Sequence, residues 1–175
     1  MQCAKDSFFV TLCGRLSRVN PARTVCINGA TRAAIVVVEN ELATSASPIE
    51  CAYFIQWSAA QICKGFEGAP EPLVSIECDI CYGTSGTRED GSERGRTLTA
   101  LDSELLQILM PPFTEKCDYT NAGALSLKSN IFWTSPRISP SAENPGAGEI
   151  GATTKTKVPI FHLAKLTVFF YPEVS

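Results

Sequence analysis

The residues of this sequence that most readily suggest chemistry are Cys78 and Cys81, which form a CxxC motif within IECDIC. Such a pair can hold zinc together with a second ligand pair, or can form a redox site at the start of a helix. Here it lies in PLVSIECDICYG, which alternates with the period of a β-strand. Side chains three apart on a strand point to opposite faces, so the two thiols cannot readily bind one metal ion. We therefore predict a strand with no metal site, with Cys78 in the core and Cys81 at the surface or an interface.

Other candidate catalytic residues are few. His162 is the only histidine, so any Ser–His or Cys–His arrangement must use it. It falls on an apolar face of the final strand, where we expect a structural role. Cys117 could supply a nucleophile, and Glu77 and Asp79 share a strand face and could act as an acid pair. Their spacing equally fits an exposed polar face, and we favour that interpretation.

The first part of the chain predicts a helix followed by a hairpin. Apolar residues recur at helical spacing over residues 6–19. Asn28-Gly29 lies between two β-prone segments, a strong signal for a type I′ turn. The second arm, residues 33–38, is apolar at every position, so we expect it to be covered on both faces.

Three further strands follow from the pattern of side chains. Residues 52–63 and 73–82 alternate, although a helix from Ser58 onward is an alternative for the first segment. The terminal segment VPIFHLAKLTVFFYPEV is apolar on both parities near its middle. A central or partly covered strand fits that pattern.

A second long helix is expected over residues 98–110, where leucine and isoleucine form an apolar stripe. Thr97 is its expected N-cap, and two prolines end it. Asp102 and Glu104 are expected on its solvated side.

Two polar segments, residues 83–97 and 134–157, read as long loops. The first contains GTSGT, which lacks the phosphate-binding pattern GxxxxGK[ST]. It also carries charges of both signs, which could be a solvated loop or a contact surface that sets partner choice. These candidate contact residues are Arg88, Glu89, Asp90, Glu93, Arg94 and Arg96.

Length and composition place the chain among globular proteins. Its 175 residues suit one domain over 1–175, and 45% hydrophobic with 19% charged residues suits a packed core. A net charge of −3 argues against a specific nucleic-acid partner. No segment approaches the roughly 18 apolar residues of a membrane span, and MQCAKDSFF lacks the apolar run of a signal peptide. We expect synthesis in the cytoplasm, with the eight cysteines as free thiols.

These elements predict an α+β fold of two layers. The expected sheet is mixed and mostly antiparallel, with two main helices packed on it, in the order α-β-β-β-β-α-β.

The element order, with DSFFVTLCGRLSRVNPARTV, ERGRTLTALDSELLQILMPP and LTVFFYPEV, resembles the tail terminator proteins of long-tailed bacteriophages. The resemblance implies a virion subunit without enzymatic activity or cofactor. It would form a homo-oligomeric ring, usually a hexamer, at the head-proximal end of the tail tube. The implied partners are the tail tube protein, the head connector or stopper protein, and the sheath protein where one exists. Assembly would take place in the host cytoplasm.

Three alternatives remain open from the sequence. One is another phage neck protein, such as a head-completion or stopper protein. A second is a small cytosolic enzyme that uses Cys117 or the pair Glu77 and Asp79. A third is a monomeric binding module.

Overall fold

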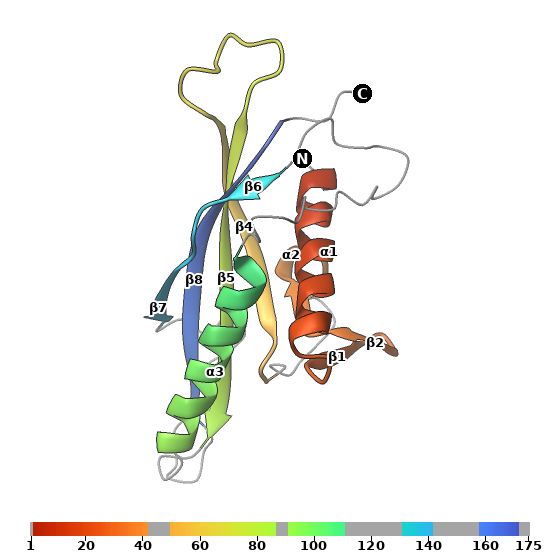
Figure 1. Cartoon of the computed structure of the whole chain (residues 1–175), viewed down its shortest axis with the longest axis vertical. Helices are drawn as coiled ribbons and strands as arrows, with labels where there is room; N and C mark the ends of the chain where they lie inside the picture. The colour runs from red at the N-terminus through yellow and green to blue at the C-terminus, as the bar shows by residue number, and fades with distance from the viewer. Residues whose placement is uncertain (1, 42–49, 87–90, 111–130, 142–157, 172–175) are drawn as a thin grey trace.

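The computed structural model describes residues 2–41, 50–86, 91–110, 131–141 and 158–171. They form an α+β fold in which two long helices lie on one face of a mixed, mostly antiparallel sheet, as predicted (Figure 1). The helices are α1 (Gln2–Val19), α2 (Val38–Glu41) and α3 (Gly91–Leu109). The strands are β1 (Thr24–Ile27), β2 (Ala30–Ala33), β3 (Ile35–Val37), β4 (Tyr53–Ile62), β5 (Val74–Gly86), β6 (Phe132–Trp133), β7 (Arg137–Ser141) and β8 (Val158–Phe170).

The main sheet has the order β3-β4-β5-β8-β6, and β7 also pairs with β8. Its centre is the antiparallel pair of β5 and β8, which runs from Val74 opposite Phe170 to Gly86 opposite Val158. The strands predicted over 52–63 and 73–82 are β4 and β5, so the helical alternative after Ser58 is wrong. Only β3 is parallel to its neighbour among the described strands.

Helix α1 packs through apolar residues spaced four apart. Ala4, Phe8, Leu12 and Leu16 are all buried. Because this stripe begins at Ala4, the helix starts at Gln2, four residues before the start expected from the sequence.

The predicted hairpin is confirmed, but the segment predicted as its second arm is divided among three elements. Asn28 and Gly29 have φ of 51° and 79°, the left-handed values that a type I′ turn requires. The strand that pairs in the hairpin is β2, which ends at Ala33, so most of the predicted arm lies outside the hairpin: residues 35–37 form β3 in the main sheet, and Val38 begins α2. Residues 33–37 are all buried, as expected for a segment covered on both sides.

The prediction of a long loop over residues 83–97 is wrong. Strand β5 continues to Gly86 because β8 pairs with it along its whole length. Gly83 suits this pairing, since a Cβ at that position would lie 2.5 Å from the Phe161 ring. Helix α3 starts at Gly91, so Thr97 lies inside the helix, where its hydroxyl donates to the carbonyl oxygen of Glu93 at 3.0 Å.

The second predicted loop, residues 134–157, is also partly wrong. Residues 137–141 form β7 on the edge of the sheet, and 142–157 lie outside the described residues. The observed element order thus matches the predicted one with α2, β6 and β7 added and the hairpin arm split.

Candidate functional site

The charged residues predicted to contact a partner divide between two regions. Arg88, Glu89 and Asp90 lie outside the described residues. Glu93, Arg94 and Arg96 lie in the first two turns of α3. Glu93 and Arg96 are exposed there, whereas Arg94 is half-buried. The described part of the predicted contact surface is therefore a helix terminus and not a loop.

The position of α3 is fixed first by a buried carboxylate. Glu104 accepts hydrogen bonds from Asn20 Nδ2 and Arg23 Nε, both at 2.6 Å, and from the Tyr53 hydroxyl at 2.8 Å. The Tyr53 oxygen also lies 3.0 Å from the carbonyl oxygen of Leu101. Burial, followed by the hydrogen bond to Glu104, raises the pKa of Tyr53 well above its usual value, so the phenol stays a donor. This cluster joins α3 to β4 and to the segment after α1.

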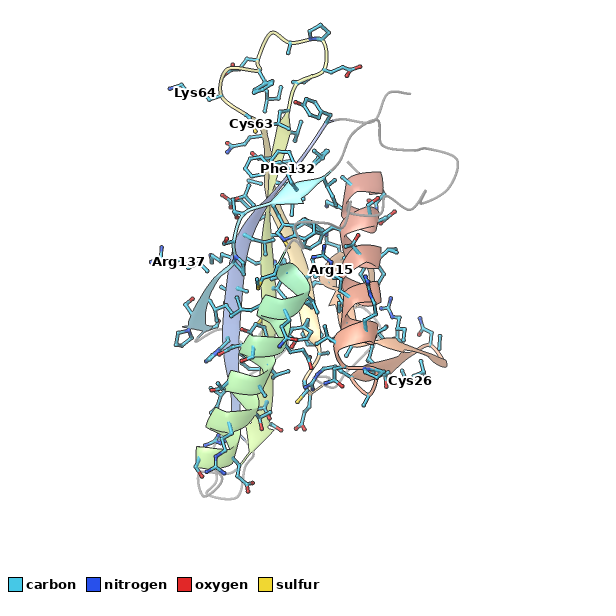
Figure 2. All side chains as sticks on the ribbon, viewed as in Figure 1. Arg15, Cys26, Cys63, Lys64, Phe132 and Arg137 are labelled. Carbon is cyan, nitrogen blue, oxygen red and sulfur yellow. The ribbon has the colours of Figure 1, made fainter. Side chains whose placement is uncertain are left out.

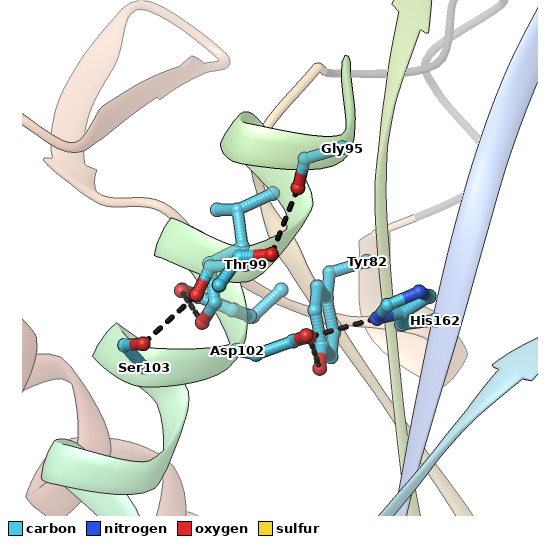
Figure 3. Close-up of polar contacts among 8 residues, drawn as sticks. Tyr82, Gly95, Thr99, Asp102, Ser103 and His162 are labelled. Carbon is cyan, nitrogen blue, oxygen red and sulfur yellow. Dashed lines mark hydrogen bonds and ion pairs between the residues drawn. The ribbon is translucent and has the colours of Figure 1, made fainter. Parts of the chain in front are cut away.

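A second carboxylate on α3 reaches the middle of the sheet (Figure 3). Asp102 Oδ1 accepts a hydrogen bond from the Tyr82 hydroxyl at 2.6 Å and lies 2.8 Å from His162 Nδ1. Burial, together with this bond to Asp102, raises the pKa of Tyr82 strongly. The rings of Tyr82 and His162 pack edge to face, with centroids 6.1 Å apart. Asp102 thus ties α3 to β5 and β8 at once.

An arginine from α1 binds the C-terminal end of α3. Arg15 is buried, and its Nη1 donates to the carbonyl oxygens of Ile108 at 2.9 Å and Met110 at 3.1 Å. These carbonyls lie at the C-terminal end of a helix, where a cation is favoured. The guanidinium also lies over the Trp133 ring, 5.2 Å from its centroid. Three polar anchors therefore hold the C-terminal half of α3, at Asp102, at Glu104 and at the carbonyl groups of Ile108 and Met110.

The expectation that Asp102 and Glu104 are solvated is wrong. For Glu104, its position within the apolar stripe of α3 indicates burial. Glu104 is three residues after Leu101 and four before Ile108, and both neighbours are fully buried. A polar residue at such a position must find partners in the core. The partners of Glu104 come from residues 51 to 84 positions away in the sequence, which no local pattern connects.

His162 lies on the helix-facing side of β8, as the alternation predicted, and its bond to Asp102 supports the structural role we expected. An aspartate that orients an imidazole is also the arrangement that general acid–base catalysis uses. Within the described residues, Tyr82 and Asp102 are the polar groups that contact His162. These contacts join α3 to β5 and β8, so we assign His162 a structural role.

The remaining sequence candidates lie apart from this cluster. Cys78 is fully buried on the helix side, while Cys81 is half-buried on the opposite side, so the CxxC motif is part of a strand, as predicted. Burial raises the pKa of the Cys81 thiol to about 11. Glu77 and Asp79 lie on the side of the sheet away from the helices, and Cys117 lies outside the described residues.

No group of three His, Cys, Asp or Glu side chains that could hold a metal ion occurs among the described residues. In the same part of the chain, no helix is both long and apolar enough to cross a membrane. Neither a protein-family model nor a curated protein sequence matches the chain.

Proposed function

We propose that this chain is a structural subunit of a phage tail, forming a ring that ends the tail tube and joins it to the head. The sequence resemblance to tail terminator proteins suggests this function. The observation that carries it further is the start of α3, which presents Glu93 and Arg96 to solvent at one end of the molecule, while the C-terminal half of the same helix is anchored to α1 and the sheet (Figure 1).

Ring closure needs two different patches on each subunit, because the front of one subunit meets the back of the next. The start of α3 lies at one end of the long axis, and the connection between β4 and β5 lies at the other (Figure 1). The charges of opposite sign on α3 suit a contact in which electrostatics sets register and partner choice. Exposed ion pairs add little binding free energy singly, so we assign these residues to specificity.

The test is reversal of one charge in tails assembled in the host. Arg96→Glu should leave the thermal unfolding of the purified chain nearly unchanged, because the side chain is exposed. Electron microscopy should show that tails made with this variant have uncontrolled length or fail to join heads. Arg96→Lys, which keeps the charge, is the matched control and should give normal particles.

Normal tails with Arg96→Glu would remove this helix terminus from the mechanism. Deletion of the whole gene separates the two neck functions. Overlong tubes indicate a terminator, whereas tails of normal length that stay free of heads indicate a head-completion or stopper protein.

A further inference from the structure

The turn of the β1–β2 hairpin contains the one Asn-Gly step of the sequence, at Asn28 and Gly29. Both residues are exposed to solvent. Glycine has no Cβ, so nothing shields the backbone nitrogen that follows the asparagine. An exposed Asn-Gly step can therefore react with itself, through attack of the backbone on the asparagine side chain.

The reaction is deamidation, and it needs only water as a co-reactant. The Gly29 backbone nitrogen loses its proton and attacks Asn28 Cγ. The new N–Cγ bond closes a five-membered succinimide ring, and the side-chain amide group takes up a proton and leaves as ammonia. Water then adds to one of the two ring carbonyls and breaks its bond to the nitrogen. The product is aspartate when the Cγ bond breaks and isoaspartate when the backbone bond breaks.

The closed turn holds the reacting atoms apart. The φ values of 51° at Asn28 and 79° at Gly29 fit a type I′ turn, in which ψ of the first central residue is about +30°. At that ψ the Gly29 nitrogen and the Asn28 Cβ lie on opposite sides of the bond between Cα and the carbonyl carbon. Ring closure requires them on the same side, so the turn must open first.

The hairpin is only lightly attached to the rest of the molecule. Within the described strands, β1 and β2 pair only with each other, through four residue pairs. Val25 and Ala33 are its buried residues, and Arg32 lies over the Phe9 ring of α1, 5.2 Å from the centroid. In Figure 2 the labelled Cys26 marks the hairpin, which extends away from the main sheet beside the end of α1. A hairpin of two short strands is marginally stable by itself, so this one should open while the core stays folded.

We propose that Asn28 is a site of spontaneous deamidation, and that the reaction proceeds through local opening of the β1–β2 hairpin. The two products differ in their effect on the turn. Aspartate at position 28 still suits it, because Asp-Gly also favours type I′. Isoaspartate adds one carbon to the backbone, so Ile27 and Ala30 can no longer pair in register. The reaction thus converts part of the protein to a form with an altered hairpin.

The experiment follows deamidation of the purified full chain at pH 8 in reducing buffer by peptide mass spectrometry. A synthetic peptide of residues 24–33 supplies the rate of the open hairpin. The chain should react about ten- to a hundredfold more slowly than the peptide, since local opening is only mildly unfavourable. Reaction through global unfolding of an ordinary domain would be slower by more than about a thousandfold. Asn20 is the internal control and should stay intact, because the nitrogen of Pro21 carries no hydrogen.

Urea and one variant separate local from global opening. Below the unfolding transition the rate should depend little on urea, because opening the hairpin exposes little surface. Arg32→Ala should raise the rate severalfold by removing the contact with Phe9, whereas Arg96→Ala on α3 is the matched control and should leave it unchanged. Circular dichroism checks that both variants keep the fold.

Four results would each overturn the proposal. They are a rate equal to that of the peptide, a rate more than about a thousandfold lower, a rise with urea as steep as that of global unfolding, and an unchanged rate in Arg32→Ala.

Discussion

Glu104 is the buried carboxylate at the centre of a hydrogen-bond network in the core. It is 8% exposed and accepts hydrogen bonds from Asn20, Arg23 and Tyr53. Glu104→Ala would leave the Arg23 charge without its partner, so we expect a loss of about 3–5 kcal/mol in the free energy of unfolding. Urea denaturation measures this loss.

Glu93→Ala serves as the control for Glu104, because Glu93 is an exposed glutamate of the same helix. Its effect should stay within about 0.5 kcal/mol. Equal effects of the two substitutions would show that the buried network does not stabilise the fold.

Cys81 gives a residue-scale prediction about pH. Burial, and next the charge of Asp79, raises the pKa of its thiol from 9.0 to about 11. Only the thiolate reacts with iodoacetamide. At pH 8 Cys81 should therefore be alkylated far more slowly than the exposed Cys26, and its rate should keep rising until the pH reaches about 11. Peptide mass spectrometry of dilute protein follows both sites, and equal rates at pH 8 would contradict the raised pKa.

At the scale of elements, two glycines predict opposite effects of the same substitution. Gly14 lies on the exposed side of α1, with no atom within 4 Å of a built Cβ, so Gly14→Ala should stabilise the helix by about 0.5–1 kcal/mol. A Cβ on Gly83 would collide with the carbonyl oxygen of Ile160 and the ring of Phe161. Gly83→Ala should cost about 1–3 kcal/mol. Thermal or urea unfolding compares the two, and a neutral Gly83→Ala would mean that β5 and β8 can separate locally without loss.

Helix α3 offers a second comparison within one element. Leu101 is fully buried against the sheet, while Leu106 is 41% exposed on the far side. Leu101→Ala should lower the free energy of unfolding by about 2–5 kcal/mol. Leu106→Ala should lower it by much less, since it leaves no cavity. The reverse order would mean that the buried face of α3 has been assigned incorrectly.

At the scale of the whole molecule, both layers share one core, so we expect them to unfold together. Phe8 of α1 packs edge to face against Trp57 of β4 and Trp133 of β6, with centroids 5.5 and 5.2 Å apart. Tryptophan fluorescence therefore reports the docking of α1 on the sheet, and circular dichroism reports the helices. The two urea transitions should coincide. Separate midpoints would show that the chain is not a single cooperative domain.

The sequence by itself determined the main elements, because their signals are local. The hairpin at Asn28-Gly29, the strand around IECDIC and the stripe of α3 all depend on residues close together in the chain. Because local patterns predict the order of the elements, they also predict the α+β fold class. Alternation alone was enough to separate Cys78 from Cys81.

Only the tertiary structure decided where β5 ends, where α3 begins and what the polar residues of α3 do. Residues 83–86 lack apolar character, yet they are a strand because β8 supplies their hydrogen bonds from more than 70 residues away. Asp102 and Glu104 looked like solvated residues, but His162 and Arg23 reach them from distant segments. In each case the partner comes from far along the chain, and a pattern of neighbouring residues carries no information about it.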